Sequence, residues 1–289
     1  MDHKKLFALA VAATLSALGG GLASAGTVNI NPSKDNTLYE YDPLDGDKSN
    51  ALGFHFFAGE TGMNELRRGV LAFDIANNIP PGAMITAASL SLNMSRAPTT
   101  NPYAMELHKL LADWGEGTSI ASGEEGDGAP ATPNDATWRH RFFDAIFWTT
   151  QGGDFSATVS ASQMVGGVGQ YTWSSAQMVA DVQGWLDNPA SNFGWLMLGD
   201  ESVFLTAKRF DTRESANPPV LAITYVPSGT PTPTATATPS ATSTVTPSAT
   251  PTATATSTAT ATATSTPTAS PLPRSTPRPK PRPTPAPRP

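Results

Sequence analysis

Two carboxylates three positions apart, Asp113 and Glu116, lie in the sequence DWGEGT beside the indole of Trp114. Glycosidases use two carboxyl groups about 5–10 Å apart, one of them with a raised pKa. A bent loop could give this separation, and the indole could stack on a sugar. The pattern is equally typical of a structural turn, with Gly115 and Gly117 at positive φ and the tryptophan filling a strand end. We favour the turn and predict no catalytic residue.

Aromatic and basic residues gather between Asp113 and Trp173, a segment that we expect to be a long loop excursion. Long loops on a rigid scaffold commonly bind ligands, because an exposed indole offers a flat face to a pyranose and a guanidinium can bind a carboxylate. The alternative is that the rings hold the excursion in place and its charges are solvated. The candidate ligand-binding residues are Trp114, Glu116, Trp138, Arg139, Arg141 and Trp148.

Acidic residues are also closely spaced in two short sequences, DPLDGDKSN and GEEGDG. Calcium binds several oxygens from carboxylates, amides and the backbone. The first sequence lacks the glutamate that completes an EF-hand, and solvated acidic loops are the alternative for both. We expect no required cofactor, and the one metal that we consider is a structural Ca²⁺. Its candidate ligands are Asp42, Asp45, Asp47, Glu124, Glu125 and Asp127.

Motifs for other chemistries are missing from the sequence. The chain has no cysteine, no nucleophile elbow, no phosphate-binding loop and no zinc pattern. A polysaccharide lyase would need a base, but His55, His108 and His140 are scattered, and we expect His108 to face solvent. A carbohydrate-active enzyme, a lyase or a glycosidase, therefore stays only an alternative.

Charges of both signs alternate in TAKRFDTRE and around RRGVLAFD. Such charges near paired strands usually form ion pairs that fix strand register. The alternative is that the basic residues contact a sugar that carries a carboxylate. The residues concerned are Arg67, Arg68, Asp74, Lys208, Arg209, Asp211, Arg213 and Glu214.

The two ends of the 289-residue chain differ from its middle. Residues 1–25 have a basic start, an apolar run and an Ala-Ser-Ala ending, which predicts a signal peptide and a secreted or cell-surface protein. No other stretch is expected to span a membrane. Residues 229–289 are rich in Thr, Ala, Pro and Ser, which predicts a disordered stalk. Its basic end suggests a contact with the cell envelope, and a solvated spacer is the alternative.

Residues 26–228 suit one all-β domain. They contain 11 Lys and Arg against 23 Asp and Glu, a net charge of −12. Nucleic-acid binding needs a basic face, so this class of ligand is not expected. The domain has no cysteine for a disulfide, so its stability must come from its core.

Short alternating segments predict about eight strands, the clearest being Ala88–Ser95, with apolar residues on one face. The Pro80-Pro81-Gly82 sequence before it predicts a turn. Helical spacing in SSAQMVADVQGWLDNP predicts one helix that begins at Ser174 or Ser175 and stops at Asn188-Pro189. We predict an all-β jelly-roll or Greek-key sandwich with one short helix and a long loop excursion. Trp185 and Trp195 are expected in its core.

Several of these segments, in order along the chain, resemble the DNRLRE-type domain, also called disaggregatase-related. They are DNTLYE, RRGVLAFD, IPPGAMITAASLSL, ADWGEGTS, NDATW, QGGDF, NPASNFGWLMLGDE, TAKRFDTRES and PPVLAITYV, and they extend from about Val28 to Val226. The resemblance implies a β-sandwich in an exported or surface protein. Some relatives in that family resemble carbohydrate-binding modules, including alginate binders attached to lyases, and many others stand alone without an assigned activity.

We therefore expect a secreted, non-catalytic protein that binds an extracellular polysaccharide. The main alternative is a purely structural component of a surface layer or matrix, without a small ligand. The second alternative is the carbohydrate-active enzyme discussed above.

Overall fold

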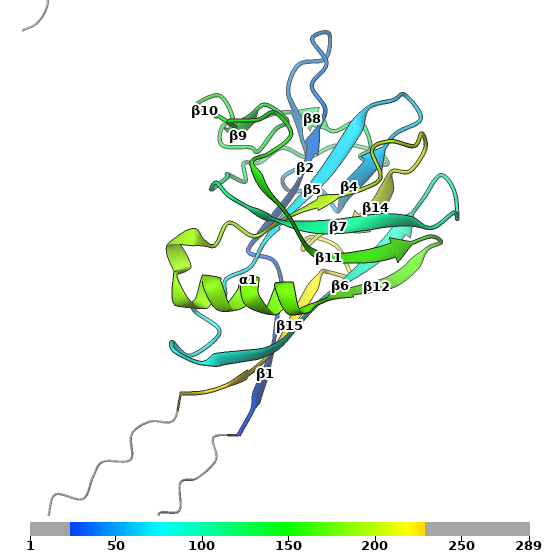
Figure 1. Ribbon diagram of the computed structural model, residues 1–289. Coiled ribbons are helices and arrows are strands. Elements are labelled where there is room, and N and C mark those ends of the chain that lie inside the picture. Colours follow the sequence, from blue (N-terminus) through cyan, green and yellow to red (C-terminus); the bar gives the residue numbers. More distant parts are fainter. Residues whose placement is uncertain (1–23, 229–289) are drawn as a thin grey trace, which may run out of the picture. The chain divides into compact units, whose positions relative to one another are not determined.

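The computed structural model describes residues 24–228 (Figure 1). The predicted tail at 229–289, and residues 1–23 of the predicted signal peptide, lie outside this range. Among the described residues, no helix is long and apolar enough to cross a membrane. The elements, in chain order, are β1 (Gly26–Ile30), β2 (Lys34–Tyr39), β3 (Lys48–Ser49), β4 (His55–Glu60), β5 (Leu66–Ala72), β6 (Met84–Arg96), β7 (Tyr103–Leu110), β8 (Ala129–Pro130), β9 (His140–Phe142), β10 (Ile146–Phe147), β11 (Phe155–Val165), β12 (Gly169–Ser174), α1 (Ala176–Asp187), a 3₁₀ turn η1 (Pro189–Ser191), β13 (Trp195–Leu198), β14 (Lys208–Asp211) and β15 (Val220–Val226).

Eleven strands form one antiparallel sheet that curls over on itself. Its first half contains β1, β15, β6, β14 and β4, with β12 on the other side of β6. Its second half contains β2, β5, β13, β7 and β11. The halves join where the end of β4 pairs with the start of β5, with Gly59 opposite Arg67. The predicted all-β sandwich with one short helix is therefore confirmed.

The helix α1 is the element that the sequence predicted most closely. The Ser175 hydroxyl accepts a hydrogen bond from the Met178 N–H, which caps the helix start. The helix ends at Asp187, because Pro189 cannot continue the ladder. Its buried face packs against β6 and β11 (Figure 1). The helix thus closes the main core with apolar side chains on a 3.6-residue period.

The main core fills the space between the two halves of the sheet. It includes Phe56, Leu90, Trp173, Trp195 and Phe210, all of them fully buried. Trp185 on α1 lies edge-on to Trp195, with ring centroids 4.5 Å apart. The prediction that Trp185 and Trp195 are core residues is confirmed.

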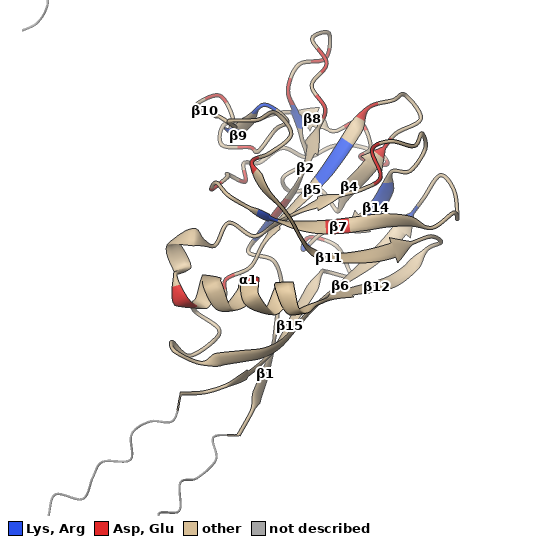
Figure 2. Ribbon diagram, in the orientation of Figure 1, with Lys and Arg blue, Asp and Glu red and all other residues tan. Residues whose placement is uncertain are grey.

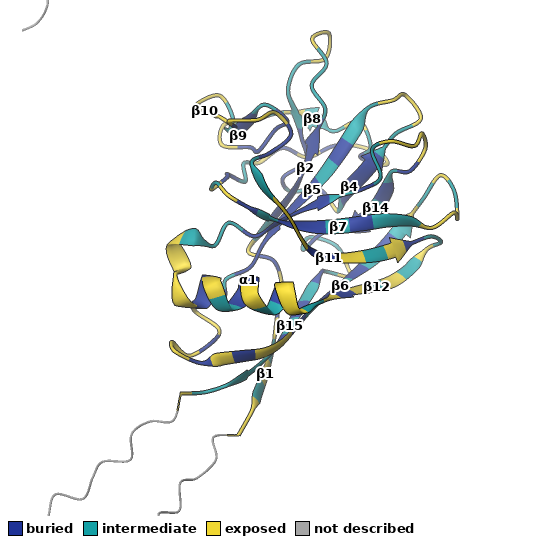
Figure 3. Ribbon diagram, viewed as in Figure 1, coloured by how far each residue is buried: buried dark blue, intermediate teal, exposed yellow. Residues whose placement is uncertain are grey.

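A second core lies on the outer face of the second half of the sheet. Strand residues alternate between the two cores, because Trp195 and Met197 face the main core while Leu196 faces the second. The second core also takes Trp114, Trp138 and Trp148 from the excursion. Figure 3 shows β5 and β7 largely buried, whereas α1 and β12 have exposed outer positions. The excursion is therefore a cover for the sheet.

The predicted excursion is too long at its C-terminal end. Residues 155–174 form β11 and β12, which join the sheet and carry Trp173 into the main core. The sequence of β11 is rich in Ser and Thr, and this strand was therefore missed. Its pairing with β7 also shifts register twice between Phe155 and Ala161. The irregular cover itself is shorter, at about residues 111–154.

Charged residues are distributed unevenly over the fold. Figure 2 shows them around β2, β4, β5 and the nearby loops. Strands β1, β11, β12 and β15 contain none. Charged side chains are thus concentrated around β2, β4, β5 and the nearby loops, which we call the charged end of the fold (Figure 2).

Truncating a ring of the second core should destabilise the fold. Replacing Trp114, which is 1% exposed, by Ala should lower the free energy of unfolding by about 3–5 kcal/mol through lost burial and a cavity. Urea unfolding followed by fluorescence measures this. The control is Ile120→Ala in the same cover, a side chain 61% exposed, which should cost less than about 1 kcal/mol. Equal costs for the two variants would contradict the second core.

Candidate functional site

The DWGEGT segment lies in the cover and has neither a turn nor regular secondary structure, so the predicted turn is wrong. Neither Gly115 nor Gly117 has positive φ. They are needed because a Cβ on Gly115 would collide with the Asn134 carbonyl oxygen, and one on Gly117 with the Asp135 carboxylate. The Gly117 N–H also donates to Asp135 Oδ1 at 3.0 Å. The glycines therefore allow close packing of two chain segments.

Glu116 belongs to a partly buried group of carboxylates around one guanidinium. Its Oε1 accepts a hydrogen bond from the Asp35 N–H at 2.8 Å, and its Oε2 pairs with Arg213 Nη2 at 2.5 Å. Arg213 also pairs with Glu214, and its N–H donates to Asp35 Oδ2. Burial raises the pKa of Glu116 to about 7, outweighing the attraction of Arg213. Burial likewise raises the pKa of Asp35 well above its usual range.

Asp113 does not share this site with Glu116. It is about half exposed and pairs with Lys34 at 2.9 Å. Neither Asp113 nor Glu116 lines either of the two main hollows of the described surface. The two carboxylates of DWGEGT therefore do not face a common substrate space.

The other predicted ligand-binding residues serve the packing of the cover. Trp114, Trp138 and Trp148 are 1%, 8% and 5% exposed, so the predicted sugar platform is wrong for these rings as they lie here. Arg139 pairs with Asp47 and lies over the Tyr41 ring. Arg141 donates to the Asp113 carbonyl at 3.0 Å. The alternative that the rings hold the excursion in place is confirmed.

His108 also departs from its expected position, because it is 5% exposed and its Nδ1 lies 2.9 Å from the Ser156 carbonyl oxygen.

The carboxylates of the two predicted metal loops do not converge. Within residues 24–228, no group of three or more His, Cys, Asp or Glu side chains could hold a metal ion. Asp42 Oδ1 accepts a hydrogen bond from the Leu44 N–H, while Asp47 is held by Arg139 and Thr137. Asp45 is exposed and, with Asp42, lines a small hollow of about 280 Å³. A structural calcium ion stays a prediction, which a melting curve in excess chelator would test.

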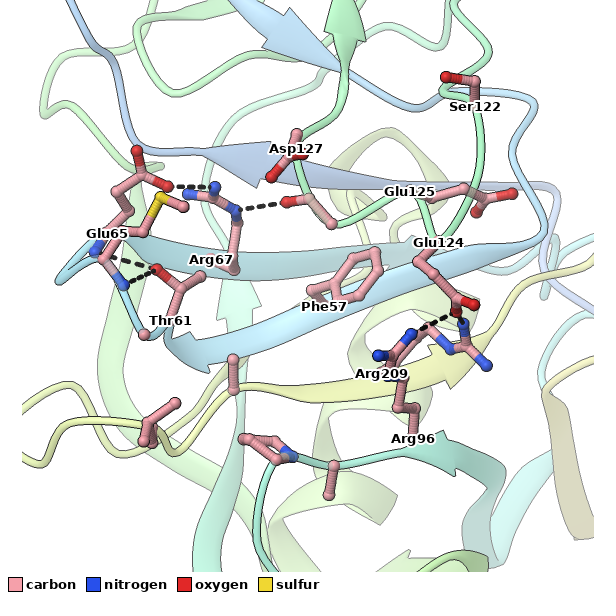
Figure 4. A pocket seen from close by; sticks show the side chains of 17 residues that line it. Phe57, Thr61, Glu65, Arg67, Arg96, Ser122, Glu124, Glu125, Asp127 and Arg209 are labelled. Carbon is pink, nitrogen blue, oxygen red and sulfur yellow. Dashed lines mark hydrogen bonds and ion pairs between the residues drawn. The ribbon is translucent and has the colours of Figure 1, made fainter.

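A groove of about 520 Å³ lies at the charged end of the fold (Figure 4). Its floor is formed by Phe57 on β4 and by the neighbouring strand β14. The loop at 61–65 forms one wall, and the loop at 122–127 from the cover forms another. Met63, 77% exposed, and Leu205 add apolar surface at the rim. Strands and cover thus build the groove together.

One end of the groove is held by Arg67 on β5 (Figure 4). Its guanidinium lies 4.9 Å from the centre of the Tyr39 ring and pairs with Glu65 at 2.6 Å. Its Nε donates to the Gly126 carbonyl at 3.2 Å, which ties the two walls together. Arg67 is 4% exposed, so it supports the two walls from inside the protein.

The other end of the groove has two arginines that face one carboxylate. Arg96 on β6 and Arg209 on β14 occupy directly opposed positions on paired strands. Glu124 Oε2 lies 2.6 Å from Arg96 Nη1 and 2.5 Å from Arg209 Nη1 (Figure 4). These contacts, Arg96 first, hold the pKa of Glu124 below its usual range. The carboxylate stays ionised and bridges the arginines.

Glu125, the next residue, fixes the loop to the sheet. Its carboxylate accepts hydrogen bonds from the N–H groups of Phe54 and His55 at 3.1 and 2.8 Å and from Asn50 Nδ2 at 3.0 Å. Burial acts to raise its pKa, but hydrogen bonds from His55, Phe54 and Asn50 bring it below the usual value. Tyr39 donates to the Glu125 carbonyl at 2.8 Å. Glu125 is thus a structural anchor, while Glu124 faces the groove.

The sequence identified some of these residues but assigned them other roles. Glu124, Glu125 and Asp127 stood out as acidic loop residues, and Arg67 and Arg209 as register-fixing charges. Ion pairs do form at TAKRFDTRE, where Arg209 pairs with Glu124 and Arg213 with Glu116 and Glu214. Glu124 and Glu116 belong to the cover and not to a paired strand, so the expected role of these charges in strand register stays a prediction. Arg96 was missed, although an arginine at the end of an alternating strand was a usable signal.

No protein-family model matches this chain, and no curated protein matches it closely enough to count as a relative. The likeness to the DNRLRE-type domain therefore rests on the quoted segments alone.

Neutralising Glu116 should change how stability depends on pH. Because the folded pKa is raised, the contribution of Glu116 to stability is full below about pH 4.5 and is lost as the pH rises through about 7. The free energy of unfolding of wild type minus that of E116Q should fall by about 2–3 kcal/mol between about pH 4.5 and 8. Denaturant unfolding at several pH values measures this difference. A difference that is constant with pH would contradict the raised pKa.

Proposed function

We propose that this protein is a secreted, non-catalytic member of the DNRLRE-type group that binds an extracellular polysaccharide in the groove. The observation that carries the proposal is an open groove, about 520 Å³, with a guanidinium braced at one end and a pair of guanidiniums at the other. Apolar surface from Phe57, Met63 and Leu205 lies on its floor and rim. This combination suits a sugar chain, which offers C–H faces and polar edges.

Four carboxylates and three arginines line the groove, and among these groups the Arg96–Arg209 pair favours a polysaccharide that carries acidic groups. Guanidinium groups bind carboxylates and sulfates with charge-assisted hydrogen bonds, and the planar fork favours two-point contacts. Arg96 is 58% exposed and so is open to a ligand from solvent. The net negative charge of the domain does not oppose this reading, because a local pair of arginines acts over short distances at physiological salt.

The acids of the groove support a binding role rather than hydrolysis. A glycosidase needs one carboxyl group with a raised pKa opposite a second one. In the groove the pKa values of Glu124 and Glu125 are lowered by their hydrogen-bond partners. The acids with raised pKa values, Asp35 and Glu116, do not line the groove. Secretion is inferred from the sequence of residues 1–25.

Removing an arginine from the groove should weaken polysaccharide binding. Arg96→Ala should raise the Kd for an acidic polysaccharide about five- to ten-fold, because one charge-assisted contact is lost. Affinity electrophoresis against acidic and neutral polysaccharides measures retention. Arg141→Ala is the matched control, since it removes the same charge from the cover, away from the groove.

Four other outcomes would lead to a different conclusion. Equal loss in both arginine variants would indicate a general charge effect, and loss only with Arg141→Ala would move the site to the cover. No retention on any polysaccharide would favour the purely structural alternative. Release of reducing ends or unsaturated uronates from the polysaccharide would favour the alternative that the protein is a carbohydrate-active enzyme.

A further inference from the structure

Glu124 differs from every other acid of the groove in being both exposed and doubly paired. Its side chain is 68% exposed, yet one oxygen contacts Arg96 and Arg209. Glu125 is buried and anchored by backbone N–H groups, and Glu65 pairs only with Arg67. Asp127 lines the groove but, within residues 24–228, is in no salt bridge with these arginines. Glu124 alone therefore occupies the two-arginine position.

The two arginines require an anion between them. Arg96 and Arg209 are cross-strand neighbours, and like charges directly opposite each other on paired strands repel. A carboxylate placed between them removes this repulsion and makes charge-assisted contacts to both. Arg209 is only 14% exposed and is also held by Ser95 through its Nε at 3.1 Å, so its guanidinium is fixed in place. Arg209 is thus held in place and Arg96 is exposed beside it, and together they form a site for one anionic group.

The loop that carries Glu124 leaves open space beside this residue, while the next residue is anchored. Gly123 precedes it at φ +64°, and a Cβ added to either Gly123 or Gly126 would meet nothing within 4 Å. The next residue, Glu125, is held by the sheet. A rotation of the Glu124 side chain into solvent would therefore free both arginines without disturbing the anchor.

We propose that Glu124 is a built-in competitor that occupies the Arg96–Arg209 site until an acidic group of the ligand displaces it. This rests on the proposed polysaccharide binding and specifies its ligand class: a chain that carries carboxylate or sulfate groups. Exchange of one anion for another keeps the charge of the site constant, so the site selects acidic chains over neutral ones. The cost of displacing an exposed carboxylate is small, which keeps the exchange reversible.

The test compares two variants that remove the same charge from the same loop. Glu124→Gln frees the arginines, whereas Asp127→Asn does not touch them. Kd values are measured for the full chain by affinity electrophoresis on polygalacturonate, polymannuronate, hyaluronan and dextran sulfate, with dextran as the neutral probe. Circular dichroism checks the fold. We expect Glu124→Gln to lower the Kd for the acidic chain that wild type binds best by about three- to ten-fold relative to Asp127→Asn, with dextran unchanged.

The outcomes separate the competitor from the binding function. If wild type binds and the two variants have equal Kd values, the role of Glu124 as a competitor would be overturned, while polysaccharide binding would still be supported. Weaker binding by Glu124→Gln would show that Glu124 orients the arginines, which also overturns it. Retention of Glu124→Gln on an acidic chain that wild type does not bind would also support the proposal, because Glu124 would then exclude the ligand completely from the wild-type site. No binding by any variant would overturn both proposals.

Discussion

The groove depends on the carboxylate of Glu125. This single group takes the N–H donors of Phe54 and His55 at the start of β4 and the amide of Asn50. The same amide group of Asn50 accepts the Ala121 N–H through its oxygen, so the cover is joined to the sheet on both sides of the loop tip. A buried ionised group is tolerated only when its lone pairs are satisfied, and here they are. The anchor places Glu124 over the arginines and completes one wall.

The cover itself is possible because the second half of the sheet is apolar on both faces. Leu196 and Val70 face the cover, while Trp195 and Leu71 face the main core. Three tryptophans from the cover fill the outer layer, and Arg68 lies 4.7 Å from the centre of the Trp138 ring. An antiparallel strand that is buried on both faces must be covered by something. Aromatic enrichment in this excursion therefore reflects packing.

The sequence predicted elements with a clear period better than it predicted the site. The spacing of apolar residues and the Ser175 cap placed α1 nearly residue for residue. The strict alternation of β6 was also visible, but the Ser- and Thr-rich β11 was not. The groove could not be predicted, because Arg67, Arg96, Glu124 and Arg209 come from four separate segments that only the curled sheet brings together. Residue types in the sequence indicated the tryptophans of the excursion as a binding surface. The pairing of strands that are distant in the sequence determines which side chains face solvent.

In the proposed function, ligand enters the groove between the loops at 61–65 and 122–127. Hydrogen exchange of the full chain, with and without the acidic polysaccharide that binds best, tests it directly. We expect slower exchange in both loops on ligand addition, with residues 133–148 of the cover unchanged. Slower exchange confined to residues 133–148, or no change anywhere at saturating ligand, would contradict it.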